Sequence, residues 1–308
     1  MRNEFTFKSK DGVTDIHAVE WVPVGRPAGI LQIVHGMVEY ILRYDEFASF
    51  LSEKGFYVVG HDHIGHGSSI VDESCLGYFC EKDANKVLLD DIHALRKLTE
   101  KKYPGIRYFI LGHSMGSYLL RQYLAIHGNA LSGAIIMGTG TQPAALLAFG
   151  KTLTKILWKI RGSKYRSPLI EYLGSGSLNA KFKKNGETPK DWITTDEGKK
   201  ALYLKDPLCG FKFTVNGYHT LFSAIAGACN AVTIRKTPQR IPLLIISGAE
   251  DPVGGFGKGV EQAFNQYATL RGGRVDIKLY PDDRHEVLNE KNRTEVYEDI
   301  YTFFIDVV

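Results

Sequence analysis

The sequence has few cysteines and no long apolar run, and each shortage excludes a class of protein. Its cysteines, Cys75, Cys80, Cys209 and Cys229, lack the paired spacing of metal ligands, which predicts reduced thiols and neither a zinc site nor a disulfide framework. No apolar run reaches the length of a membrane span, and residues 1–10 hold no apolar leader segment. We therefore expect a cytoplasmic protein.

An excess of one charge sign is missing as well. The 38 lysines and arginines nearly balance the 34 aspartates and glutamates, which leaves a dispersed net charge of +4. Without a basic block, this balance argues against a nucleic-acid partner. With 308 residues, of which 44% are hydrophobic and 23% charged, the chain suits one catalytic domain with an insertion.

Apolar runs alternate with helical patterns along most of the chain. The runs that resemble buried strands are residues 29–34, 56–59, 108–111, 134–137, 242–247 and 275–280. Strands that alternate with helices predict an α/β fold with a mostly parallel, doubly wound sheet. Two further β-rich runs, 5–7 and 16–22, flank a turn at 10–12 and predict an antiparallel N-terminal hairpin.

This alternation stops in the middle of the chain. Residues 141–240 show helical stretches, lysine-rich turns and a flexible Gly-Ser run at 174–177, but no strong strand pattern. The sequence therefore predicts a core formed by residues 1–140 and 241–308, with 141–240 inserted as a mainly helical cap.

A Gly-x-Ser-x-Gly turn follows the apolar run 108–111, with Ser114 at its centre. A strand that leads into this turn, and a helix that follows it near 117–127, are the context of a nucleophile elbow, which exposes the serine oxygen. The alternative is a chance match in a chain with 32 glycines, but the flanking strand and helix favour the elbow.

Two later residues fit the partners of a serine nucleophile, in the chain order serine, acid, histidine. Asp251 comes directly after the strand-like run 242–247, and its Asp-Pro turn favours it over the neighbouring Glu250. His285 follows the last strand-like run through a short loop, where it would act as general base and acid. A lone histidine in a polar loop is more often a solvated surface residue, but its place after Ser114 and Asp251 favours catalysis.

An oxyanion hole needs two backbone N–H donors, one after the nucleophile and one from an early loop. Met115 supplies the first, and Met37, in the His35-Gly36-Met37 segment, is the expected second. The competing interpretation of His35-Gly36 is a simple strand-ending turn.

His61, Asp62, His63 and His66 form a cluster that resembles a metal site. Its glycines and serines indicate instead a loop that braces the active site, and no matching ligand set lies elsewhere at the spacing a metal needs. We expect neither a metal nor another cofactor.

Within the predicted cap, residues 144–160 have the pattern of an amphipathic helix. Its lysines, Lys151, Lys155 and Lys159, recur every fourth residue on one face. This pattern fits either peripheral contact with an anionic membrane or a solvated face over a packed cap, and we favour the second. The aromatic residues of the predicted cap also have two interpretations, because they could line an acyl pocket or form a small hydrophobic core of the cap. They are Trp158, Trp192, Phe211 and Phe213.

The chain resembles the monoacylglycerol lipase and lysophospholipase branch of the α/β-hydrolases, which is grouped with the serine aminopeptidases of type S33. The resemblance covers nearly the whole length and depends on His35-Gly36-Met37-Val38-Glu39, Arg43-Tyr44, Asp62-His63, Gly65-His66-Gly67, Gly112-His113-Ser114-Met115-Gly116, Asp251-Pro252 and Arg284-His285-Glu286. The chain departs from the family pattern at two positions. Tyr40 stands where the family often has histidine, and Ile64 stands where it usually has arginine.

The resemblance implies an α/β-hydrolase fold and a cofactor-free serine hydrolase of lipid or small acyl esters. A serine aminopeptidase and a thioesterase use the same triad, so both stay open. The cap acids available to bind a peptide amine are Glu171, Glu187, Asp191, Asp196, Glu197 and Asp206. A hydrolase-fold binding protein without turnover is disfavoured, because nucleophile, acid, base and both oxyanion donors are all present.

Overall fold

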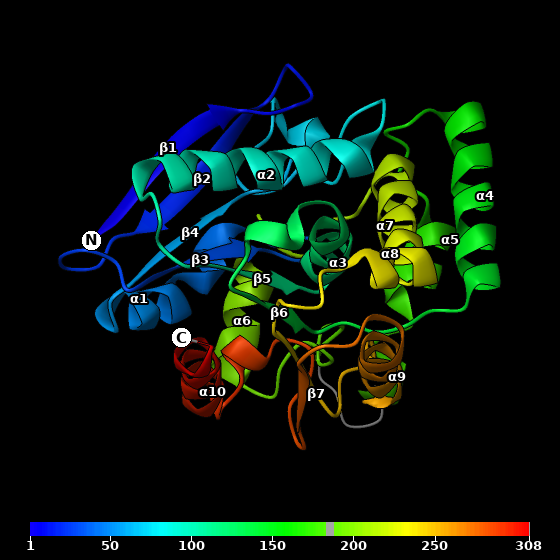
Figure 1. Cartoon of the computed structure of the whole chain (residues 1–308). Coiled ribbons are helices and arrows are strands. Elements are labelled where there is room, and N and C mark those ends of the chain that lie inside the picture. The colour runs from blue at the N-terminus through cyan, green and yellow to red at the C-terminus, as the bar shows by residue number, and fades with distance from the viewer. Residues whose placement is uncertain (183–187, 308) are drawn as a thin grey trace.

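A single eight-stranded sheet runs through the computed structural model, which describes residues 1–182 and 188–307 (Figure 1). Its strand order is β1-β2-β4-β3-β5-β6-β7-β8. The strands are β1 (Arg2–Lys8), β2 (Asp15–Trp21), β3 (Gly29–Val34), β4 (Phe56–His61), β5 (Tyr108–His113), β6 (Gly133–Met137), β7 (Leu243–Gly248) and β8 (Val275–Tyr280). β1 and β2 pair in antiparallel fashion, β2 joins β4 in the same way, and the remaining pairs are parallel. The predicted N-terminal hairpin and parallel sheet are confirmed.

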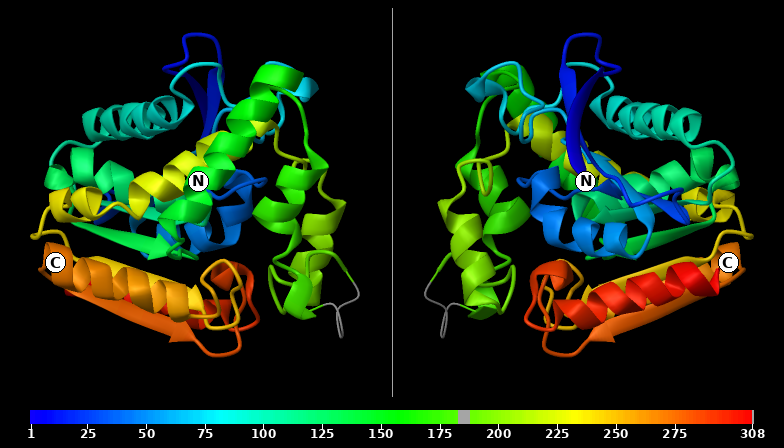
Figure 2. Two further views of the ribbon diagram at one scale, coloured as in Figure 1. Left: turned by 90° about the vertical axis from the view of Figure 1, so that its right-hand side faces the viewer. Right: turned by 90° about the vertical axis from the view of Figure 1, so that its left-hand side faces the viewer.

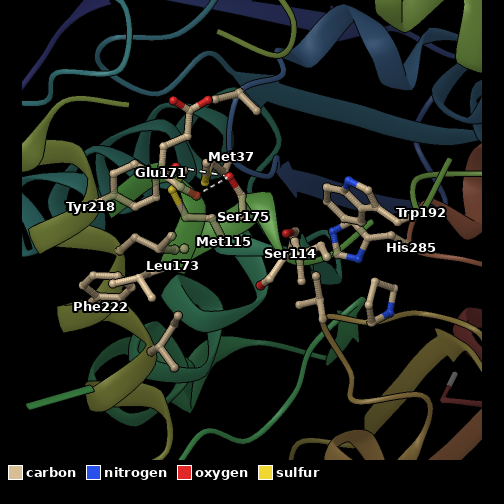
Figure 3. Close-up of a pocket in the computed structure, with 18 of the residues that line it drawn as sticks. Met37, Ser114, Met115, Glu171, Leu173, Ser175, Trp192, Tyr218, Phe222 and His285 are labelled. Atoms are coloured by element: carbon tan, nitrogen blue, oxygen red, sulfur yellow. Dashed lines mark hydrogen bonds between the residues drawn. The ribbon is translucent and has the colours of Figure 1, made fainter. Parts of the chain in front are cut away.

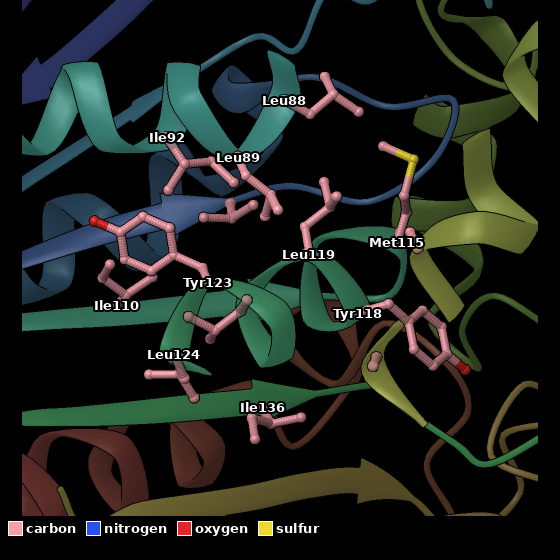
Figure 4. Packing of buried hydrophobic residues seen from close by; sticks show 14 of the residues in the cluster. Leu88, Leu89, Ile92, Ile110, Met115, Tyr118, Leu119, Tyr123, Leu124 and Ile136 are labelled. Carbon is pink, nitrogen blue, oxygen red and sulfur yellow. The ribbon is translucent and has the colours of Figure 1, made fainter. Parts of the chain in front are cut away.

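Helices cover both faces of the sheet, and further helices lie between β6 and β7. They are α1 (Asp45–Glu53), α2 (Ala84–Lys102), α3 (Met115–His127), α4 (Ala144–Arg161), α5 (Pro168–Glu171), α6 (Glu197–Lys205), α7 (Val215–Ala228), α8 (Ala231–Lys236), α9 (Lys258–Gln266) and α10 (Arg293–Asp306). Side chains of α2 and α3 pack with one face of the central strands, and those of α1 and α10 pack with the other. Figure 4 shows α2 and α3 against the sheet.

Alternation along each central strand explains why these runs are almost entirely apolar. In β5, Tyr108 and Ile110 belong to the cluster under α2 and α3, whereas Phe109 and Leu111 belong to the cluster under α1 and α10. Since successive side chains of a strand point to opposite faces, a strand covered on both faces needs apolar residues at every position. The sequence pattern therefore follows directly from the two helical layers.

Between β6 and β7 the described residues form α4 to α8 and no strand, and we call residues 141–240 the inserted segment. Its longest helix, α4, packs along α7 at one end of the molecule (Figures 1 and 2). The run 174–177, expected to be flexible, lies instead largely in a π-helical turn, Tyr172–Gly176. Within this turn, Ser175 Oγ lies 3.2 Å from the hydroxyl of Tyr218 on α7.

Among the described residues, none of the helices combines the length and apolar character needed to cross a membrane.

Candidate active site

Ser114 occupies a strained turn between β5 and α3. Its backbone has φ 52° and ψ −119°, in a region that non-glycine residues rarely enter. The turn brings strand and helix so close that a Cβ on Gly116 would lie 2.0 Å from the carbonyl oxygen of Val34, and one on Gly112 would lie 2.4 Å from that of Gly116. Both flanking glycines are thus required by close backbone approach, which leaves the serine side chain projecting from the turn.

Asp251 and His285 meet at the carboxyl ends of β7 and β8. The Nδ1 atom of His285 lies 2.9 Å from Oδ2 of Asp251, and both side chains are almost fully buried. The carboxylate also accepts hydrogen bonds from the Ser247 hydroxyl at 3.2 Å and the Val253 amide at 2.8 Å. The rival acid, Glu250, is 41% exposed and pairs with Lys181 instead, so the structure brings Asp251 and not Glu250 to the histidine.

One cavity of about 350 Å³ opens over these residues (Figure 3). Four of the five predicted site residues line it, namely Ser114, His285, Met37 and Met115, and Asp251 lies behind His285. Met115 is the first residue of α3, so its N–H has no acceptor within the helix. The elbow serine, the base and the two expected oxyanion donors therefore share one cavity.

The loop after β3, which carries Met37, is also strained. Val38 has φ 53°, an unusual value for a β-branched residue, and its carbonyl accepts a 2.9 Å hydrogen bond from the amide of Gly210 in the inserted segment. On the other side of Met37, the Gly36 amide donates to the carboxylate of Glu39. Both contacts hold the loop in the shape that sets the direction of the Met37 amide.

A buried charged network joins the oxyanion loop to the base loop. Arg43 donates to Glu39 at 2.9 Å and to both carboxylate oxygens of Glu286 at 2.6 Å. His113, beside the nucleophile, lies 3.0 Å from Glu39 through Nδ1 and 3.3 Å from the carbonyl of His285 through Nε2. The network therefore contacts all three segments that carry the reacting groups.

Charge pairing sets the protonation of this network. Burial alone would raise the pKa of Glu39, but the hydrogen bond and charge of His113 and the charge of Arg43 outweigh burial and hold that pKa well below its usual range. Burial would lower the pKa of His113, yet the bond to Glu39 raises it. The sequence motifs contain these residues but assign them no role, and the charged side chains within the motifs are the signal that could have indicated this network.

The inserted segment binds the base loop directly. The amides of His285 and Glu286 donate to the carbonyls of Trp192 and Ile193, at 3.4 and 2.8 Å. The Trp192 ring lies 5.0 Å from the imidazole of His285, centroid to centroid, and Arg284 donates to the carbonyl of Thr194. The position of the base thus depends on a stretch of chain far from it in sequence.

The histidine cluster predicted to brace the site is buried beside the oxyanion loop. Asp62 accepts hydrogen bonds from the amides of Ile41 and Ser68 and pairs with His17, so it connects three segments. His35 binds the carbonyl of Gly36 through Nδ1 and accepts from the amide of His63 through Nε2. No group of three or more potential ligands in the described ranges is arranged to hold a metal ion.

The cap aromatics divide between the two interpretations. Trp192 and Phe211 line the cavity, whereas Phe213 is fully buried in the core and Trp158 packs edge-on against His219.

Of the acids available for a peptide amine, only Glu171 lines the cavity among the described residues, and Glu187 lies outside them. Glu171 lies 3.5 Å from the ammonium of Lys212. The other acids bind elsewhere: Asp191 and Glu197 pair with Lys200, Asp196 with Arg293, and Asp206 accepts from Tyr40. In the part of the chain that the structure describes, no unpaired carboxylate of this set is left in the cavity to receive an amine.

Comparison with known proteins gives one consistent group of relatives. The family described as serine aminopeptidase, S33, matches residues 25–292. The monoacylglycerol lipase of Mycolicibacterium smegmatis is 25% identical over 99% of this chain and 97% of that protein. The monoglyceride lipase of Rattus norvegicus is 32% identical over 75% of this chain and 68% of that protein.

A solved structure matches over the whole chain. It is a highly thermostable carboxyl esterase from Bacillus coagulans in complex with glycerol, with a TM-score of 0.92 and 32% identity over 100% of this chain and 99% of that one. A soluble variant of monoglyceride lipase from Saccharomyces cerevisiae, at 20% identity and TM-score 0.76 over 99% of this chain and 95% of that one, shares the fold.

Proposed function

Because the chain belongs to the serine aminopeptidase S33 family of α/β-hydrolases, we propose that it hydrolyses monoacylglycerols, lysophospholipids or similar small acyl esters through an acyl-enzyme on Ser114. The observation that carries this proposal is the shared cavity of Ser114 and His285, with His285 bonded at 2.9 Å to the buried Asp251. Relatives named monoacylglycerol lipase, monoglyceride lipase and carboxyl esterase support an ester as the substrate.

In the proposed mechanism, His285 takes the proton of Ser114 as the serine oxygen attacks the ester carbonyl. Asp251 keeps the other imidazole proton on Nδ1 and stabilises the imidazolium. The amides of Met37 and Met115 would bind the developing oxyanion, and His285 then protonates the departing alcohol. Water, activated by the same histidine, releases the acid. No cofactor or metal is needed for these steps.

The acyl chain would occupy the apolar wall of the cavity. This wall combines residues of α4 and α7, namely Leu147, Leu153, Leu221, Phe222 and Ile225. An apolar wall favours a hydrocarbon chain over a charged peptide, because a buried charge without a partner is costly. The pairing of Glu171 with Lys212 also disfavours the aminopeptidase alternative, which requires an acid for the substrate amine.

The test combines active-site labelling with a substrate panel. A fluorophosphonate probe should label the wild type and fail to label Ser114→Ala, because the serine oxygen is the atom that the probe modifies. Monoacylglycerols and lysophospholipids should then be cleaved faster than aminoacyl amides, with acyl thioesters included to test the thioesterase alternative. Equal labelling of both proteins would refute the assignment of the nucleophile.

We also propose that residues 141–240 act as the cap of this site and that α4 contacts an anionic lipid surface, in a protein located in the cytoplasm. Four large apolar side chains of α4 are exposed: Leu146, Phe149, Ile156 and Ile160. Leu146 and Phe149 also line the cavity, so a surface that covers them would lie next to the substrate entrance. Lysines on the same helix add attraction to anionic lipid.

Phe149→Ser combined with Ile160→Ser should weaken sedimentation with vesicles of phosphatidylglycerol and phosphatidylcholine by roughly tenfold, because both exposed side chains would lose their apolar contact with lipid. Val24→Ser is the matched control, since Val24 is fully exposed on the connection between β2 and β3. Unchanged sedimentation of the double variant would contradict the proposed membrane contact and support the interpretation that α4 presents a solvated face.

A further inference from the structure

Lys190 is the one lysine or arginine side chain that lines the active-site cavity among the described residues. Each carboxylate that lines the cavity has a cationic neighbour, although two of them share the same arginine. Arg43 holds Glu39 and Glu286, and Lys212 lies 3.5 Å from Glu171. In the described part of the chain, the pKa of Lys190 is affected by burial and by the through-space attraction of Glu171 and Glu286. Lys190 forms no hydrogen bond with either of these carboxylates. Among the described residues, Lys190 is therefore a cation in the cavity that no carboxylate holds through a hydrogen bond.

The backbone that presents Lys190 is well anchored. The carbonyl of Lys190 accepts from the Ile193 amide at 3.1 Å, and its own amide donates to the Thr188 hydroxyl at 3.3 Å. Asn179 binds both the Thr188 carbonyl, at 2.9 Å, and the Trp192 amide, at 3.1 Å. Such a segment can hold a long side chain over a site with little further loss of backbone freedom.

Lys190 also lies close in sequence to a residue that contacts the catalytic base. It is two residues from Trp192, whose ring packs against His285, the residue that must protonate the departing oxygen. Its side chain passes Gly210, where a Cβ would lie 3.8 Å from Cε of Lys190, and Gly210 in turn bonds to the oxyanion loop. The apolar acyl wall is built by other elements, α4 and α7.

Burial lowers the pKa of Lys190, against the attraction of Glu171 and Glu286. A partly desolvated ammonium is stabilised when a ligand supplies a negative charge, and a phosphate oxygen provides a charge-assisted hydrogen bond. A neutral glycerol head group would leave the ammonium without this compensation.

We propose that Lys190 binds a phosphate carried by the alcohol part of the substrate, so that the site selects acylglycerol phosphates over neutral monoacylglycerols. This proposal rests on the proposed function, because it requires Ser114 to cleave the ester that joins the acyl chain to the head group. Lys190 is then a specificity residue, and the triad performs the same chemistry on both substrates.

The test compares two substrates with the same acyl chain, 1-lauroylglycerol and 1-lauroylglycerol 3-phosphate, below their critical micelle concentrations. Lys190→Met removes the charge and keeps most of the stem. It should lower the ratio of kcat/KM for the phosphate ester to that for the neutral ester by roughly 10- to 100-fold, the range for a hydrogen bond between charged groups. Lys190→Arg should retain most of the ratio, and Lys205→Met, which alters an exposed lysine of α6, should leave it unchanged.

An unchanged ratio in Lys190→Met, or an equal loss on both substrates, would overturn the head-group proposal and leave the proposed function intact. If the wild type is labelled by a fluorophosphonate but cleaves neither ester, the proposed substrate class fails, and the head-group proposal fails with it. Thermal unfolding of each variant shows whether a loss on both substrates comes from a damaged fold.

Discussion

Asp251→Asn is expected to lower kcat by about 10⁴-fold with little change in stability, as for the equivalent change in a well-studied serine protease triad. In the wild type, Oδ1 of Asp251 accepts from the Val253 amide at 2.8 Å, and Oδ2 lies 2.9 Å from Nδ1 of His285. An asparagine must keep its oxygen toward the Val253 N–H. Its NH₂ group then faces His285 and forces the imidazole proton onto Nε2, the atom that has to accept the serine proton.

The neighbouring acid provides a matched control. Glu250→Gln removes the same charge one residue away, but Glu250 is 41% exposed and pairs with Lys181, so we expect kcat to change by less than about twofold. Hydrolysis of a short-chain nitrophenyl ester by both variants measures the difference. A comparable loss in Glu250→Gln, or nearly full activity in Asp251→Asn, would contradict the assignment of Asp251 as the acid.

The sequence predicts the triad candidates because their signals are local. Ser114 follows a buried strand and precedes a helix, and the positions of Asp251 and His285 after late strands place all three at one edge of a parallel sheet. The strands are recognisable because burial on both faces removes polar residues from them. Those two rules account for the fold and for the residues gathered at the cavity.

Contacts between distant segments have no such signal. Arg43 and Glu286 are 243 positions apart, and nothing near either residue indicates that they form a bidentate pair. Gly174 shows the same limit. A glycine and serine run gives no sign of a packing partner, but a Cβ on Gly174 would lie 2.5 Å from the ring of Tyr218, so the turn packs closely against α7. Local composition indicates neither of these two contacts.

His61→Phe is expected to stabilise the protein, and to do so far more at pH 5 than at pH 8. His61 is fully buried and edge-on to Phe7, and neither of its ring nitrogens has a hydrogen-bond partner among the described residues. A phenyl ring is flat like imidazole and one ring atom larger, and it removes two polar atoms that the described part of the core leaves unsatisfied. At pH 8 the gain should be about 1 kcal/mol or less, since the imidazole there is neutral.

The pH dependence follows from the pKa. Burial lowers the pKa of His61 to about 3, from 6.5 in the unfolded chain. The stability associated with a neutral His61 is therefore fully present above pH 6.5 and is lost as pH falls. Below pH 6.5 the unfolded chain binds a proton at His61, whereas the folded chain does not. At pH 5 this amounts to about 2 kcal/mol, which His61→Phe should recover in urea unfolding. An equal gain at both pH values would contradict the assigned pKa.

His17 supplies a control of opposite sign. Its hydrogen bond to Asp62 raises the pKa of His17, so this pair stabilises the fold below pH 6.5 and loses that effect as pH rises through the higher folded pKa. His17→Gln should therefore cost more stability at pH 5 than at pH 8, whereas His61→Phe gains more at pH 5.

The acid sensitivity of the histidine cluster should extend to activity. Burial lowers the pKa of His66 to about 3 and that of His63 well below its usual value, so acid destabilises the whole cluster. His35 accepts the His63 amide through Nε2, and protonation of that nitrogen would remove the acceptor beside Gly36 and the oxyanion loop. We expect wild-type hydrolysis to be lost on incubation at pH 5 sooner than hydrolysis by His61→Phe. Equal inactivation rates would show that the cluster does not limit acid stability.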